Sequence, residues 1–255
     1  MLIDGHVHLY PDVDRHAFFS TAAANLTMAG KQAGVDPGPC VLLMAETPQE
    51  TSFDDLTAGR GVPTGWQAAV LPGGPPAIRM EGPEAQVVVL IPGRQIITKE
   101  RIEVIAVGYR GTALDDRSLD HVLATLRAEQ RPAILPWGAG KWLGGRGARI
   151  AALVSGGLPK GVFLGDNGGR PVGWPAPGVF RAAGPVLPGS DPLPVPGGWR
   201  DVGRYGFFLP GVIDPAHPTR AVITALLTLT QQPTVIGRRI SMPAFALRQI
   251  RLRAS

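Results

Sequence analysis

The chain has 255 residues, which is long enough for one α/β domain with a full hydrophobic core, and we expect a single domain over residues 1–255. Apolar residues make up 44% and charged residues 18%, a balance that argues against intrinsic disorder. The sequence has no apolar run of about 18 residues and no basic leader before an apolar stretch. We therefore expect no membrane partner, no signal peptide and a cytoplasmic location.

The formal net charge is +5, and arginines crowd the C-terminal end. These are Arg238, Arg239, Arg248, Arg251 and Arg253. No aromatic residues alternate with them and no nucleic-acid-binding motif is present, so we interpret them as a solvated basic face. The charge predicts no nucleic-acid partner, but it is compatible with an anionic substrate.

The hydrophobic pattern predicts alternating strands and helices. A strand over residues 2–9 precedes a helix over 14–33, which Asp12 or Asp14 can cap. The apolar run 40–45 predicts a buried strand that ends at Glu46. Short β segments between 66 and 108 predict an antiparallel insertion. Further strands are expected at 133–135, 161–164 and 186–187, and further helices at 116–130, 148–155, 219–230 and 241–253. This alternation is typical of a (β/α) barrel.

Two histidines, His6 and His8, stand two residues apart in the first apolar run. Residues i and i+2 of a β-strand point to the same face, so both imidazoles can aim at one point. Two neutral imidazoles supply half of a metal site, and carboxylates from elsewhere can complete it. The alternative is a half-buried strand whose histidines satisfy each other's hydrogen bonds. We interpret the pair as metal ligands.

Polar residues at the ends of later strands are the candidates to join them. The acids are Glu46, Glu103, Asp166 and Asp191. Two glycine-rich loops, 138–141 and 165–170, end in Lys141 and Arg170. Backbone N–H groups in such turns bind anions and the cation adds charge, although plain tight turns are the alternative.

The pattern Asp-Gly-His-x-His, followed much later by Gly189-Ser190-Asp191, resembles the PHP and amidohydrolase superfamilies of metal-dependent hydrolases. Residues 91–109 also resemble the PHP hairpin pattern Gly-x-Glu-Ile followed by Glu-Val-His-x-x-Gly-Tyr. The resemblance implies an α/β fold, a PHP-like distorted (β/α) barrel similar to a TIM barrel, with the antiparallel insertion around residues 66–108. It also implies that His6, His8 and Asp191 bind a divalent metal: Zn, Mn or Fe.

Several positions depart from the PHP pattern. Gln95 replaces a metal-bridging glutamate, Ile105 replaces the hairpin histidine, Leu135-Pro136-Trp137 replaces Ala-His-Pro, and Leu193 replaces the histidine after Gly-Ser-Asp. We therefore expect a reduced site with a single ion instead of a complete trinuclear centre.

Three hypotheses about function remain open. The first is a PHP-type hydrolase that acts on a phosphoester or another small anionic substrate through a metal-activated water, with Asp191 or Glu103 as general base. Its substrate-binding residues would be Gln95, Lys141, Asp166 and Arg170. The second is a catalytically degenerate barrel that acts as a binding or regulatory module. The third is an amidohydrolase-like enzyme that hydrolyses a C–N bond, with Lys141 as a bridging carbamate. The sequence leaves the substrate, the metal and the oligomeric state open.

Overall fold

The computed structural model describes residues 1–36, 38–211 and 213–254, which form two mixed β-sheets and six α-helices. The seven-stranded sheet has the order β12-β11-β1-β2-β5-β4-β3. Its strands are β1 (Leu2–Val7), β2 (Cys40–Met44), β3 (Gln67–Leu71), β4 (Ala77–Glu81), β5 (Val87–Ile91), β11 (Tyr205–Phe208) and β12 (Thr234–Gly237). β1, β2 and β5 pair in parallel, and the other neighbours pair antiparallel.

The five-stranded sheet has the order β10-β9-β8-β7-β6. Its strands are β6 (Gly93–Ile97), β7 (Glu103–Val107), β8 (Ala133–Pro136), β9 (Val162–Asn167) and β10 (Val186–Gly189). The last three pair in parallel, whereas β6 with β7 and β7 with β8 pair antiparallel.

The predicted barrel is wrong, because the strands form two separate sheets and neither is closed. The reason lies in the short connections 72–76, 82–86 and 98–102, which join successive strands through five residues each. A parallel neighbour requires a crossover of about a dozen residues or more, so these strands fold back antiparallel. The predicted insertion around residues 66–108 is likewise divided: β3, β4 and β5 belong to one sheet, and β6 and β7 to the other.

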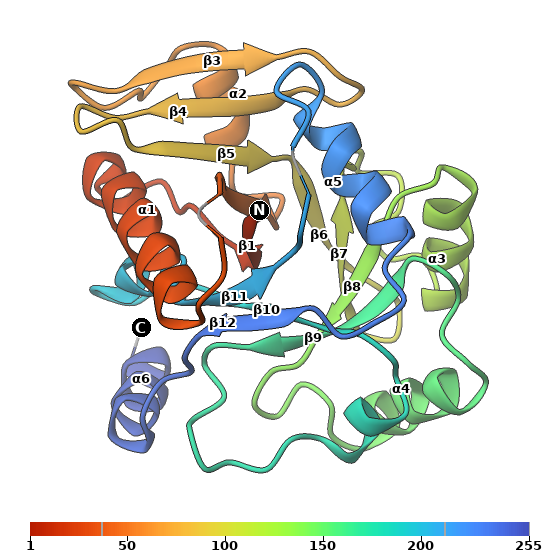
Figure 1. Cartoon of the computed structure of the whole chain (residues 1–255). Helices are drawn as coiled ribbons and strands as arrows, with labels where there is room; N and C mark the ends of the chain where they lie inside the picture. Colours follow the sequence, from red (N-terminus) through yellow and green to blue (C-terminus); the bar gives the residue numbers. More distant parts are fainter. Residues whose placement is uncertain (37, 212, 255) are drawn as a thin grey trace.

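The helices flank the sheets on different sides. In Figure 1, α1 (Arg15–Gln32) lies beside the seven-stranded sheet, and α3 (Leu119–Ala128) and α4 (Gly145–Ser155) lie beyond the five-stranded sheet. The remaining helices are α2 (Ser52–Thr57), α5 (Pro218–Leu227) and α6 (Met242–Ala254). The predicted cap of α1 is confirmed, since Asp14 Oδ1 accepts a hydrogen bond from Ala17 N at 3.1 Å. No helix in the described ranges is both long and apolar enough to cross a membrane.

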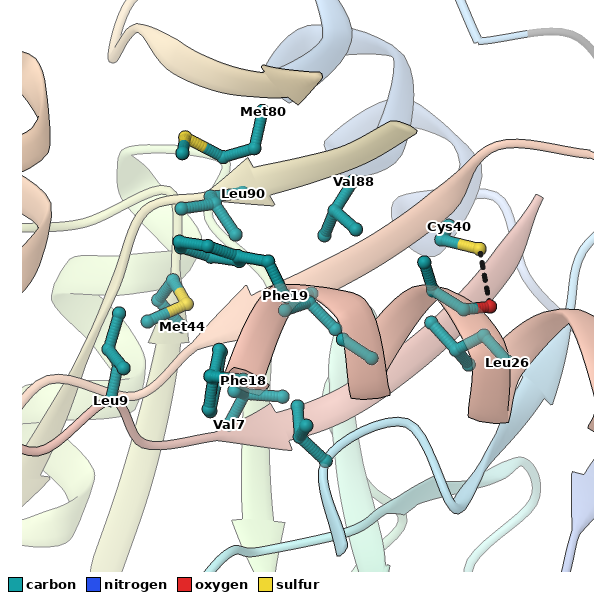
Figure 2. Close-up of a cluster of buried hydrophobic side chains, with 14 of the residues drawn as sticks. Val7, Leu9, Phe18, Phe19, Leu26, Cys40, Met44, Met80, Val88 and Leu90 are labelled. Atoms are coloured by element: carbon teal, nitrogen blue, oxygen red, sulfur yellow. Dashed lines mark hydrogen bonds between the residues drawn. The ribbon is translucent and has the colours of Figure 1, made fainter. Parts of the chain in front are cut away.

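Hydrophobic packing joins these layers. Figure 2 shows Phe18 and Phe19 of α1 against side chains of the seven-stranded sheet such as Met44 and Leu90. The predicted burial of Cys40 is confirmed, and its thiol donates to Ala23 O at 3.8 Å. A second cluster contains side chains of both sheets: Ile3, Val41, Ile105, Phe163 and Leu187. The two sheets therefore share a core.

The end of β10 lies directly against β1. Asp191 N donates to His6 O at 2.9 Å. Glycines make this approach possible, because a Cβ atom on Gly5 would lie 2.6 Å from Pro188 O and one on Gly189 would lie 2.5 Å from His6 N. Side chains at these two positions would force the backbones apart. The contact places the end of a late strand beside the two histidines.

Candidate metal centre

Three buried side chains meet at this contact. His6 Nε2 lies 3.0 Å from His8 Nε2, and Asp191 Oδ1 lies 3.6 Å from the first and 3.8 Å from the second. The three residues form a group that could hold a metal ion, with ligand atoms within 4.8 Å of one another. A point equidistant from the three atoms lies about 2 Å from each, which matches zinc–imidazole and zinc–carboxylate bond lengths. The residues present therefore fit a single ion.

The strand backbone positions the two histidines, as the sequence predicted. His6 is near the end of β1 and His8 follows two residues later, so their rings share a face. Asp191 follows β10 with φ +48, a left-handed conformation that aspartate tolerates better than most residues. Asn167 Nδ2 donates to Asp191 Oδ2 at 2.5 Å and leaves Oδ1 directed at the imidazoles.

Glu50 orients His8, a role that no sequence pattern indicates. Its Oε1 and Oε2 lie 3.2 and 3.1 Å from His8 Nδ1. A carboxylate can only accept, so Nδ1 carries the proton and the lone pair of Nε2 faces the centre. Thr47 N donates to Glu50 Oε2 at 2.7 Å, and Tyr10 stacks on His8 with ring centroids 5.5 Å apart. Glu50 belongs to a loop after β2 and has no motif that would have identified it.

The electrostatics suit a cation. Burial lowers the pKa of His6 to about 4, so the ring is neutral near pH 7. Burial alone would raise the pKa of Asp191, but His6 and Lys141 together with the other neighbours hold it below its usual value. Burial opposes protonation of His8, yet the Glu50 carboxylate raises its pKa. The charged carboxylate of Asp191 and the neutral imidazole of His6 are forms that bind metal, whereas the raised pKa of His8 means that metal binding competes with a proton at this ring.

Three further predicted residues surround the triad. Lys141 Nζ donates to Glu103 Oε2 at 2.5 Å, and the same ammonium interacts electrostatically with Asp191. Gln95 on β6 interacts with His6 in a way that favours the protonated ring, although its buried Oε1 makes no hydrogen bond of regular geometry among the described residues. This oxygen can interact with His6 or with a group bound beside it.

The other two predicted substrate-binding residues are engaged with each other. Arg170 Nε and Nη2 donate to the two oxygens of Asp166 at 2.7 and 2.6 Å, and Tyr205 Oη donates to Asp166 Oδ2 at 2.8 Å. Both charged residues are buried. The structure does not bring Asp166 or Arg170 to the metal triad.

A pocket of about 150 Å³ opens beside the triad. Asp191, Lys141 and Asn167 provide its polar wall. Its apolar wall includes Trp137 and Leu193, and α6 contributes Phe245, Arg248 and Gln249. The C-terminal helix thus forms part of the pocket wall beside the candidate metal centre, which sequence patterns did not predict.

No protein-family model matches the chain, and no curated protein matches it. Among solved structures, the crystal structure of PsfC from Pseudomonas syringae PB-5123 is similar over 99% of this chain and 98% of that chain, with a TM-score of 0.52 and 15% sequence identity. At this identity the similarity concerns the fold alone. The resemblance to the PHP and amidohydrolase superfamilies remains a prediction from sequence.

Proposed function

We propose that this protein is a hydrolase that uses one divalent metal ion, held by His6, His8 and Asp191, to hydrolyse a small anionic substrate. The observation that carries the proposal is the triangle of buried ligand atoms, with sides of 3.0, 3.6 and 3.8 Å. Three protein ligands with a further position left open are characteristic of catalytic zinc sites. When bound, such an ion supplies Lewis acidity and lowers the pKa of a water molecule to about 7.

Glu103 is the better of the two candidates for general base. Asp191 directs Oδ1 at the imidazoles, and its Oδ2 accepts from Asn167. Glu103 is not part of the triad and is half-buried beside it. Its carboxylate can accept a proton from water, while Lys141 attracts the anionic group of the substrate.

A second candidate function is a metal-free binding module. The distance of 3.0 Å between the two Nε2 atoms also fits an imidazole–imidazole hydrogen bond, which would satisfy both rings without an ion. This alternative and the hydrolase differ in metal content, so one measurement separates them.

The test is elemental analysis of the purified protein before and after reconstitution with Zn²⁺, Mn²⁺ or Fe²⁺. We expect about one equivalent in the wild type and less than about 0.1 equivalent in His8→Ala, because affinity requires all three ligands. His121→Ala is the matched control, since His121 is exposed on α3. Absence of metal from the reconstituted wild type would overturn the proposal.

A substrate screen completes the test. Phosphomonoesters, phosphodiesters and cyclic amides are incubated with the metal-loaded protein and with His8→Ala. Hydrolysis of one class by the wild type and not by His8→Ala would support the hydrolase. Stoichiometric metal with no turnover of any class would contradict both the hydrolase and the metal-free binding module.

A further inference from the structure

The pocket beside the triad has the size of a small ligand. Its volume of about 150 Å³ equals that of engineered protein cavities that bind benzene. A ring the size of benzene therefore fills its apolar part, with a small polar group directed at the polar lining, and a fused bicyclic ring does not fit without movement of the wall.

The walls of the pocket differ in character. Trp137, Leu193 and Phe245 contribute apolar side chains to the lining, and Lys141 contributes a cation. Phe245 is held in place by an edge contact with Trp174, with ring centroids 5.6 Å apart. A ligand with an apolar body and one anionic group matches this division.

Hydrogen-bonding capacity is also available. The side chain of Gln249, half-buried in the pocket wall, has no hydrogen-bond partner among the described residues. Both cations of the pocket wall have a carboxylate partner: Arg248 forms an ion pair with the buried Asp201, and Lys141 forms one with Glu103. Of the two, Lys141 is the cation whose charge also acts on Asp191 of the triad.

The charge around the triad limits the charge of the ligand. Imidazoles that bind an ion are neutral, so in the metal-bound centre the carboxylates of Glu50, Glu103 and Asp191 outweigh the ammonium of Lys141 by two negative charges. One divalent ion balances these two charges. An incoming monoanion then adds one negative charge to a neutral centre, whereas a phosphate dianion adds two in a partly dehydrated site, which costs more.

We infer that the pocket beneath α6 is the substrate site, and that it takes a small monoanionic carboxylate with an apolar body about the size of a benzene ring. The carboxylate lies at Lys141 and the apolar body lies against Trp137, Leu193 and Phe245. This inference rests on the proposed function and specifies the anionic and apolar parts of its substrate. The probes used below lack a hydrolysable bond and report binding only. It also makes α6 the element that determines which molecules reach the metal.

The experiment uses the full chain loaded with Co²⁺, whose visible absorption reports on ligands that enter the metal environment. Acetate, benzoate, 1-naphthoate and phenylphosphonate are titrated, and affinities are checked by calorimetry. We expect benzoate to bind at least about tenfold more tightly than acetate, because it buries a ring, and more tightly than the other two probes. Equal affinity for 1-naphthoate, or tighter binding of phenylphosphonate, would overturn the inference.

Two variants locate the binding site. Leu193→Trp fills the pocket and should weaken benzoate binding by about tenfold or more. Leu143→Trp adds the same indole at a side chain that is 69% exposed and outside the pocket, and should bind benzoate like the wild type. Unchanged benzoate affinity in folded Leu193→Trp would contradict the assignment.

The metal content of each sample separates this inference from the proposed function. A protein that binds Co²⁺ stoichiometrically but shows no preference for benzoate overturns the inference and leaves the metal centre intact. A protein that binds no metal overturns the proposed function. If calorimetry on that metal-free protein still showed tighter binding of benzoate than of acetate or 1-naphthoate, the result would support the pocket as the site of a benzene-sized carboxylate.

Discussion

Glu50 lies with both carboxylate oxygens against His8 Nδ1, at 3.2 and 3.1 Å, on the side of the imidazole that faces away from the other two ligand atoms. In metalloproteins a carboxylate placed in this way beside a metal-binding histidine fixes the tautomer and the orientation of the ring. Thr47 N in turn fixes the carboxylate. Glu50 is therefore a positioning residue for His8.

Replacing Glu50 should weaken metal binding without removing a ligand. We expect Glu50→Ala to raise the dissociation constant for Zn²⁺ by about 10- to 100-fold, because His8 loses the partner that orients it. Glu50→Gln keeps an oxygen acceptor for His8 Nδ1, so its affinity for Zn²⁺ should fall less than that of Glu50→Ala. Competition with a chromogenic chelator measures both. Glu84→Ala, at an exposed glutamate, is the control, and equal affinities in Glu50→Ala and Glu84→Ala would refute the role.

The close contact between β10 and β1 predicts that a side chain at Gly189 lowers both the stability of the protein and its metal affinity. In Gly189→Ala the new methyl group would lie 2.5 Å from His6 N, so the strands must separate. We expect a loss of about 1–3 kcal/mol in the free energy of unfolding, from the cost of overpacking. Metal affinity should fall as well, because Asp191 moves with the strand end. Urea denaturation and metal titration measure the two effects.

Gly178→Ala is the matched control for this substitution, since no atom lies within 4 Å of the position that its Cβ would take. Gly178→Ala should change neither the free energy of unfolding nor the metal affinity. A Gly189→Ala protein as stable as Gly178→Ala would show that the strand contact tolerates a side chain.

Glu46, at the end of β2, predicts a pH dependence of stability. Burial raises its pKa to about 7 from an ordinary value of 4.5, while its Oε1 accepts from Phe53 N at 2.6 Å. Because the folded pKa exceeds the unfolded one, the stability this group contributes is present below pH 4.5 and is lost as the pH rises through 7.

Glu46→Gln removes this titration and keeps the acceptor. The free energy of unfolding of the variant relative to the wild type should therefore rise by about 1–3 kcal/mol from pH 5 to pH 8. Urea denaturation at both pH values measures it, with Glu84→Gln as the exposed control. Parallel pH profiles for Glu46→Gln and the wild type would contradict the burial of a protonated carboxyl group.

The buried pair of Asp166 and Arg170 predicts a structural role for both. Arg170→Met leaves the Asp166 carboxylate buried with only Tyr205 as a side-chain donor, and should cost about 3–5 kcal/mol of stability. Arg60→Met removes an exposed pair with Asp55 and should cost at most about 1 kcal/mol. If Arg170→Met instead kept its stability and lost benzoate affinity, the residue would be a substrate ligand, as the sequence suggested.

Local sequence features were sufficient to predict the three candidate metal ligands and the cap of the first helix. The two-residue spacing of His6 and His8 determines that they share a face of a strand, and Asp14 is recognisable as a helix cap from its position alone. Asp191 could be predicted as a partner because it follows a short strand, supported by the family resemblance. Each of these depends on neighbouring residues or on one strand end.

The remaining features depend on contacts between distant segments. β11 pairs antiparallel with β1 across about 200 residues of chain, and no local pattern specifies that direction. Glu50 reaches His8 from a loop, and α6 reaches the pocket from the other end of the chain. Alternation of strands and helices alone therefore suggested a barrel where two mixed sheets form.

The division of labour between strands and the C-terminal helix has an evolutionary consequence. The candidate ligand atoms lie at the ends of β1 and β10, whereas Phe245, Arg248 and Gln249 belong to α6 at the other end of the chain. Under the proposed function, mutations in α6 should change the pocket and leave the candidate ligands in place. Selection for a new ligand could then act on one helix while the candidate centre is inherited unchanged.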